Sequence, residues 1–242
     1  MNNVVAIPLE FKIACEIIKV DIHKILQAFI DHVSFLQLYS DRYVERYSEA
    51  SIVIISYIKG KEQLLGDFNS FHHLTPCERE VMDKIISIIQ AKDYSEAKQR
   101  NKAAACVKRF DGMIDGEYID SDKVKIQEHA ELSLTRDFRL TCQLYHVFAF
   151  EYLEYFMNNI SLAEMIAMES LGIQIVDPAQ LFFISLFNKK RLLDVMTLET
   201  GFLKSFVLLR EECSKVDSLD DRIILFKSFF NSYFKYVKSR GL

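Results

Sequence analysis

Five basic side chains within one short stretch are the residues whose types and spacing point most directly to chemistry. They are Lys98, Arg100, Lys102, Lys108 and Arg109. Lysine and arginine bind phosphate oxygens through charge and hydrogen bonds, so a helix that carries them is a candidate contact for nucleic acid. A charge run of this kind is also typical of a solvated helix face. The five are therefore candidate nucleic-acid contacts, with a solvated face as the alternative.

Segment 111–122 combines carboxylates with glycine and is the second chemically suggestive group. Its residues Asp111, Asp115, Gly116 and Asp122 fall at the first, fifth, sixth and twelfth positions of an EF-hand-like calcium loop. Met113 stands where calcium needs an oxygen ligand, and Asp122 replaces the usual bidentate glutamate. The segment is better interpreted as an acidic loop between helices, and calcium binding is the alternative.

Signals for catalysis are missing from the sequence. It has no His-Glu-x-x-His, no Gly-x-Ser-x-Gly and no phosphate-binding glycine loop. None of its histidines has an acidic residue three positions earlier, which removes the helical carboxylate–histidine metal motif. We therefore expect no catalytic residues, no metal and no cofactor. An enzyme or ligand carrier with an aromatic cavity between Phe148, Phe182 and Phe230 is a further alternative.

The elements that must position these residues are expected to be helices. The chain has only 7 Gly and 3 Pro, so few residues break a helix, and its 19 Phe and 11 Tyr can fill a large core. Val4, Val5 and Ile7 precede Pro8 and predict one short strand. We expect an all-α fold, a multi-helix bundle of about nine helices with one short N-terminal strand or arm.

Charge and hydropathy restrict the partners and the compartment. The formal net charge is −4, which disfavours nucleic acid as the main partner. The N-terminus resembles no signal peptide, and the most apolar stretches, 51–58 and 181–187, are too short to span a bilayer. The 5 Cys form no Cys-x-x-Cys pair and are expected to be buried reduced thiols. These features predict a cytoplasmic protein without a membrane partner.

Helix signals divide the chain into two helical parts around the acidic loop. Thr75, Pro76 and Glu78 form a capping box, and Asp21, Ser161, Asp177 and Ser218 are further predicted caps. Gly172 is expected to end a helix. One long helix is expected over 123–157, and the last one over 219–240. The predicted parts are an N-terminal helical part over 1–110, the acidic loop 111–122 and a C-terminal bundle over 123–242.

Residues 1–36 resemble the ribbon-helix-helix module. The resemblance rests on the run from Val4 to Phe11, a helix, a turn near Asp21 and a second helix, and the module-like part extends to about residue 38. It implies a strand that pairs with a second chain and enters the DNA major groove. The strand departs from the family because it offers Asn2 or Asn3 as its polar reader and no basic side chain. The alternative is a strand that packs on its own bundle.

Leu74 to Met82 is similar to the opening helix of the LuxR-type helix-turn-helix domain. The similarity stops there, because one long basic helix follows where that family has two short ones. A capping box at the start of an amphipathic helix explains the same residues.

Structural signals without catalytic ones favour a non-enzymatic cytoplasmic protein that acts through its helical surfaces. Self-association, as a homodimer, is the expected partnership. The alternative is a DNA-binding transcriptional regulator, in which the N-terminal part contacts DNA and the C-terminal bundle dimerises or senses a ligand.

Overall fold

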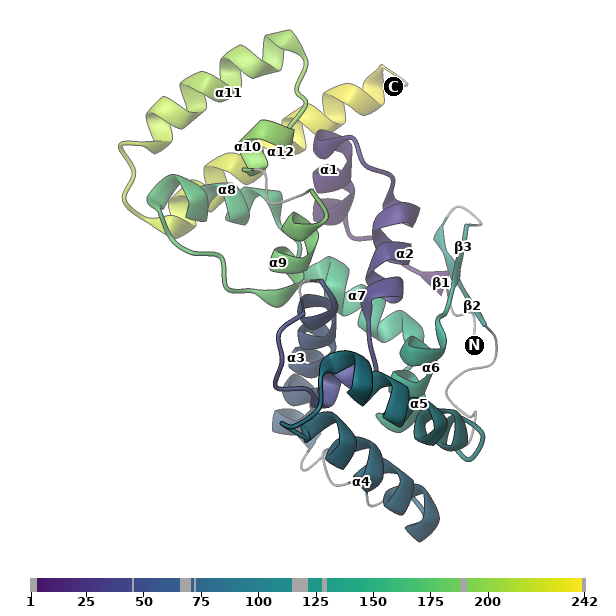
Figure 1. Cartoon of the computed structure of the whole chain (residues 1–242). Coiled ribbons are helices and arrows are strands. Elements are labelled where there is room, and N and C mark those ends of the chain that lie inside the picture. The colour runs from purple at the N-terminus through teal and green to yellow at the C-terminus, as the bar shows by residue number, and fades with distance from the viewer. Residues whose placement is uncertain are drawn as a thin grey trace. The chain divides into compact units, whose positions relative to one another are not determined.

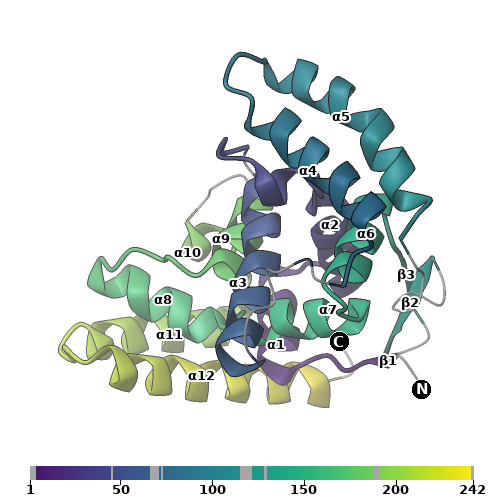
Figure 2. The same ribbon diagram turned by 90° about the horizontal axis from the view of Figure 1, so that it is seen from below.

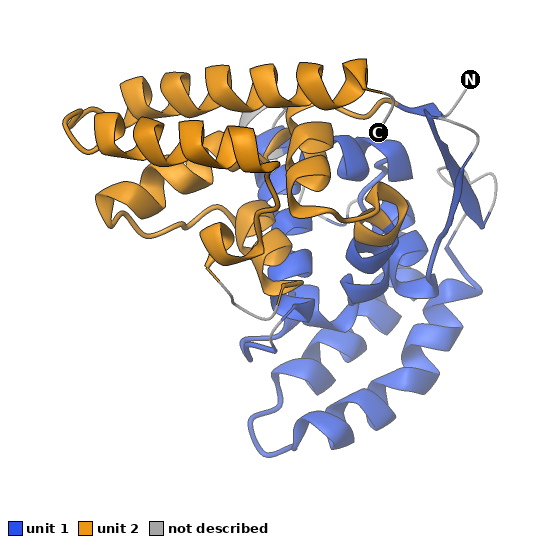
Figure 3. Ribbon diagram, turned by 90° about the horizontal axis from the view of Figure 1, so that it is seen from above, with its two compact units in different colours: residues 1–5, 27–155 blue, residues 6–26, 156–242 orange. Residues whose placement is uncertain are grey.

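A computed structural model of the chain describes residues 4–44, 46–65, 71, 73–114, 122–127, 130–187 and 191–240. It forms two compact units (Figure 3). Unit 1 comprises Met1–Val5 and Gln27–Tyr155, and unit 2 comprises Ala6–Leu26 and Phe156–Leu242. The division falls within two helices, α2 (Ile22–His32) and α7 (Ala149–Asn158).

Unit 1 combines helices with a small sheet (Figure 1). Besides its parts of α2 and α7, its elements are β1 (Val4–Val5), a 3₁₀-helix η1 (Leu36–Tyr39), α3 (Tyr47–Leu65), α4 (Pro76–Gln90), α5 (Glu96–Asp111), β2 (Lys123–Ile126), β3 (Glu131–Ser133) and α6 (Arg136–Leu144). Helices α4 and α5 pack against each other as a hairpin. The basic stretch of the sequence lies on α5.

Unit 2 is built around its last helix. Besides the remaining parts of α2 and α7, its elements are α1 (Leu9–Ile18), α8 (Leu162–Leu171), α9 (Pro178–Ser185), α10 (Leu192–Val195), α11 (Thr200–Cys213) and α12 (Leu219–Ser239). Helix α12 contacts α1, α8 and α11, and Figure 2 shows α8, α11 and α12 running alongside one another.

The helical class is confirmed, but the expected number of helices is wrong. The described residues contain twelve α-helices, and three strands accompany them. The single helix expected over 123–157 is also wrong, because β2, β3, α6 and α7 occupy that stretch. Residues 123–126 alternate exposed and buried side chains with the two-residue period of a strand. Thr135 then caps α6 by accepting the backbone N–H of Phe138 at 3.2 Å.

The N-terminal strand pairs within its own chain. Strand β1 runs parallel to β2, with Val4 beside Lys125, and β2 runs antiparallel to β3. The Gln27 side chain bonds both the N–H and the C=O of Ser133, each at 2.9 Å, and so covers the backbone of β3. This pairing differs from the one that the ribbon-helix-helix resemblance implies, in which a second chain supplies the mate.

Several local signals are confirmed at the helix ends. Thr75 and Glu78 form the predicted capping box of α4. The side chains of Ser161, Asp177 and Ser218 each accept a backbone N–H at the start of α8, α9 and α12. Gly172 follows α8 with a φ of 68°, a left-handed conformation that glycine adopts without strain.

Aromatic rings fill the core of each unit. In unit 1, Phe138 packs edge-on against Phe29 and Tyr152. In unit 2, Phe206 of α11 contacts Phe226 and Phe230 of α12. Burying one such ring contributes roughly 1.5–3 kcal/mol relative to leaving it exposed.

The cysteines are free thiols and differ in burial. Cys15, Cys142 and Cys213 are buried as expected, but Cys106 is only half-buried and Cys77 is exposed, so the expectation fails for these two. Cys77 lies in the first turn of α4, away from that helix's buried face. Among the described residues, we find no helix with the length and hydropathy needed to cross a bilayer.

Candidate binding groove

A groove in unit 2 lies between the end of α8, the C-terminal half of α11 and the first turns of α12. Its volume is about 340 Å³, within the range of small-molecule sites. Its lining combines cationic, hydroxyl and apolar side chains from Ser170, Val207, Arg210, Glu211, Ser214, Arg222 and Phe226. These residues come from three helices, so the groove exists only once the helices pack.

Local sequence signals position each wall of this groove. Helix α8 ends at Gly172, two residues after Ser170. Helix α12 begins at its Ser218 cap and buries Arg222 and Phe226 one turn apart. Helix α11 is attached to α12 through Phe206, whose ring centroid lies 6.0 Å from that of Phe226.

Arg222 is the unusual residue of the groove because it is a buried cation. Its side chain is only 5% exposed. Nε donates to the carbonyl of Val216 at 2.5 Å, and Nη1 donates to the carbonyl and the hydroxyl of Ser170 at 3.0 and 2.7 Å. Among the residues that the structure describes, no carboxylate forms an ion pair with it. Neutral acceptors therefore hold the guanidinium in place and leave its charge unbalanced.

The surroundings of Arg222 give the groove a positive balance. Arg210 and Arg222 line it together with a single carboxylate, that of Glu211. Burial raises the pKa of the nearby Glu169 carboxyl, while the charges of Arg191 and Arg210 oppose that rise. Two arginines and one carboxylate among the described lining residues make the groove suited to binding an anion.

Helix α11 also presents an exposed apolar face. Within its fourteen residues only Phe206 and Cys213 are buried. Leu203 and Val207 are each 49% exposed, and Leu208 is 61% exposed. Apolar side chains that are grouped on an open helix face mark a contact surface.

The five predicted nucleic-acid contacts lie on α5, but the structure does not bring them to one face. Lys98 and Lys102 lie over the ring of Tyr94, with Nζ 4.4 and 4.0 Å from its centroid. Lys102 also donates to the Tyr94 hydroxyl at 2.8 Å, and this hydrogen bond lowers the pKa of that phenol. Arg109 shares this side of the helix and contacts the sulfur of Cys77.

Arg100 lies on another side of α5, and Lys108 is exposed. Arg100 pairs with Glu96 at 2.5 Å and lines a groove of about 570 Å³ in unit 1. That groove carries two arginines, Arg100 and Arg136, and two aspartates, Asp31 and Asp137. The opposite charges balance, so this groove has no preference for the charge of a ligand.

A half-buried polar cluster around Glu151 in unit 1 was not predicted from the sequence. Glu151 accepts hydrogen bonds from Tyr57 at 2.9 Å, Lys61 at 2.5 Å and the backbone N–H of Phe148 at 2.9 Å. Burial is the largest influence and raises the pKa of Glu151, but these hydrogen bonds together outweigh it and leave the pKa lowered. Glu151 lies three residues after Phe148, which is the spacing at which a glutamate side chain accepts the backbone N–H at the start of a helix. This spacing is the one sign of the cluster that the local sequence contains.

The acidic loop lies largely outside the described residues. Asp111 ends α5, and Asp122 forms an ion pair with Arg139. Asp115 and Gly116, which the calcium hypothesis needs, lie outside the described residues. Within the described ranges, no three His, Cys, Asp or Glu side chains are grouped to hold a metal ion.

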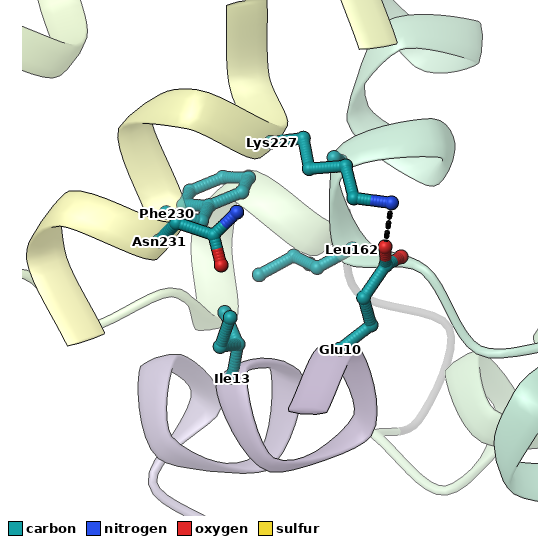
Figure 4. A pocket seen from close by; sticks show the side chains of 7 residues that line it. Glu10, Ile13, Leu162, Lys227, Phe230 and Asn231 are labelled. Carbon is teal, nitrogen blue, oxygen red and sulfur yellow. Dashed lines mark ion pairs between the residues drawn. The ribbon is translucent and has the colours of Figure 1, made fainter. Parts of the chain in front are cut away.

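A second cavity in unit 2 is too small to be a ligand site. Glu10 of α1 and Lys227 of α12 form an ion pair beside it, and Ile13, Leu162 and Phe230 enclose it (Figure 4). Its volume of about 10 Å³ is close to that of one water molecule.

A comparison of the chain with known protein-family models, with curated proteins and with solved structures finds no match.

Proposed function

We propose that the chain is a non-enzymatic cytoplasmic protein that acts through its helical surfaces and self-associates through α11. The observation that supports this proposal is the exposed apolar face of α11, where Leu203, Val207 and Leu208 lie open. The same face of a second copy can bury these side chains, because a two-fold interface joins identical patches.

The charges on α11 favour a two-fold, antiparallel pairing of this helix with itself. Lys204 and Glu211 are seven residues apart on the same side of α11, and both are exposed. They lie at equal distances from a two-fold axis between Val207 and Leu208. Such an axis places each Lys204 opposite Glu211 of the second copy, so two opposite-charge contacts flank the apolar centre.

The size of this face predicts a weak dimer. A stable interface buries about 800 Å² on each partner, and one side of a helix of this length offers less. We therefore expect a dimer whose population rises with protein concentration.

The test is the mass in solution over a range of concentrations, measured by light scattering or sedimentation. Val207→Asp and Leu208→Asp should each shift the protein to monomer, because a buried unpaired carboxylate opposes association. The matched control is Ile224→Asp, which changes an apolar residue that is 64% exposed on α12 and not on α11. A wild-type monomer at every concentration, or equal loss of dimer in the control, contradicts the proposal.

A DNA-binding regulator is the second candidate function, and the observation that favours it lies on α5. Lys98, Lys102 and Arg109 share one side of that helix, and the half-buried Tyr94 lies beneath the two lysines. Such a stripe can follow a phosphate backbone. The two candidates are distinguished by salt, because phosphate contacts weaken steeply as salt rises and the apolar contact of α11 does not.

A further inference from the structure

We propose that the unit 2 groove binds a small amphipathic anion through Arg222 and Arg210. The ligand class is an organic carboxylate or a phosphate monoester that carries an apolar group. This inference concerns a site that shares Val207 and Glu211 with the proposed dimer face of α11, and it does not depend on self-association.

The first argument is that one nitrogen of the Arg222 guanidinium has no protein partner among the described residues. Nε and Nη1 are both occupied by protein acceptors. Nη2 forms no hydrogen bond with a described residue and is not fully enclosed, and Arg222 lines the groove, so this nitrogen is the donor that remains for a ligand there. A guanidinium that is held rigidly by two of its nitrogens presents the third at little entropic cost.

The unbalanced charge is the second argument. A buried charge is costly unless a counter-charge accompanies it. Arg222 is only 5% exposed, and its acceptors are the carbonyl of Val216 and the two oxygens of Ser170. The Ser170 hydroxyl donates to the carbonyl of Ala167 at 2.7 Å, so its lone pairs face the guanidinium. An anion in the groove would supply the missing counter-charge.

The remaining lining defines the ligand. Arg210 adds a second cation, and Glu211 opposes an anion from the same wall. Phe226 and Val207 provide an apolar surface beside these charges. The volume of about 340 Å³ accommodates a small molecule but not a folded partner. An anionic group attached to a ring or a short chain satisfies both kinds of lining.

The test is an NMR titration of the full-length protein with benzoate and with phenyl phosphate, which distinguish the two anion classes. The neutral probe benzyl alcohol is the ligand control. Leu208→Asp is titrated in parallel, because Leu208 does not line the groove and the substitution removes any dimer that could cover it. We expect at least one anion to shift the Arg222 Nε–H signal with a dissociation constant on the order of 1 mM or tighter.

Substitutions of the lining then test the assignment. Arg210→Gln should weaken binding roughly tenfold, because a charge-assisted contact is lost. Glu211→Gln, made in the Leu208→Asp protein so that self-association does not contribute, should tighten it by about threefold, because a charge that repels the anion is removed. Lys215→Gln removes one positive charge beside α11 without touching the groove and should change binding less than about twofold. Arg222→Lys, followed through the backbone amide signals of the groove residues, should weaken binding by roughly tenfold or more, because the guanidinium contact is lost. The Arg210 variant keeps the test valid if that protein does not fold.

Three outcomes would overturn the proposal. One is the absence of any shift with either anion up to about 10 mM. Another is equal binding of benzyl alcohol and benzoate, which would show that charge has no part. The third is an equal loss of affinity in Arg210→Gln and Lys215→Gln, which would show only a general effect of net charge.

Discussion

Arg222 Nη1 lies 2.7 Å from the hydroxyl oxygen of Ser170, and this contact joins the first turns of α12 to the last turn of α8. The same guanidinium bonds the carbonyl of Val216, in the link before α12. One side chain therefore holds three segments of unit 2 and also lines the groove between them.

Replacing Arg222 should destabilise the fold. Arg222→Gln leaves the carbonyls of Val216 and Ser170 without their donors, so we expect the free energy of unfolding to fall by about 2–3 kcal/mol. Urea unfolding followed by circular dichroism measures the change. Arg210→Gln is the control, because Arg210 is exposed and its replacement should stay within about 0.5 kcal/mol. Equal stability of the two variants would contradict the joining role of Arg222.

Charge reversal on α11 tests the register of the proposed dimer. Lys204→Glu alone, or Glu211→Lys alone, places like charges opposite each other twice and should weaken association by roughly tenfold. The double variant restores opposite charges and should recover the wild-type dissociation constant, measured by sedimentation. Additive weakening in the double variant would exclude the antiparallel register.

The Glu151 cluster predicts a stability change in acid. The folded-state pKa of Glu151 is lowered, so its contribution is complete above the unfolded pKa and is lost as pH falls through the folded pKa. At neutral pH, Glu151→Gln should cost about 1–2 kcal/mol. The difference in unfolding free energy between wild type and Glu151→Gln should therefore be constant from pH 7 to about pH 5.5, and shrink below about pH 4.5. A difference that stays constant down to pH 3 would show that the ionised carboxylate contributes nothing.

The lysine stripe of α5 gives a prediction for DNA binding. If this face contacts DNA, Lys98→Ala with Lys102→Ala should reduce the slope of log affinity against log salt by about 2, because two phosphate contacts are lost. Fluorescence anisotropy with a labelled duplex measures this slope. Lys215→Ala with Lys238→Ala removes the same charge from unit 2 and should leave the slope unchanged. Binding that is absent at low salt would remove the regulator hypothesis.

Local features of this chain were predictable because their causes lie within a few residues. The Thr75–Glu78 capping box joins residues three apart, and the left-handed turn at Gly172 needs only the absence of a β-carbon. The scarcity of glycine and proline likewise indicated helices, since each helical hydrogen bond is local.

Contacts between residues that are far apart in the sequence could not be predicted in this way. Strand β2 pairs with the nearby β3 and also with β1, where Val4 lies beside Lys125 from more than a hundred positions away. The helical pattern expected over 123–157 contains no sign of this pairing. Glu151 meets Lys61 across 90 positions, and Arg222 meets Ser170 across 52. No pattern within a single sequence window marks such pairs.

The sequence by itself therefore determined the helical class, the caps and the apolar stripes, because these depend on short-range backbone geometry and hydrophobic periodicity. Only the tertiary structure decided which charges are buried, which face of α11 stays open and which helices enclose a groove. Those features depend on packing between distant segments, where burial changes the free energy of a charge or an apolar side chain far more than its local sequence does.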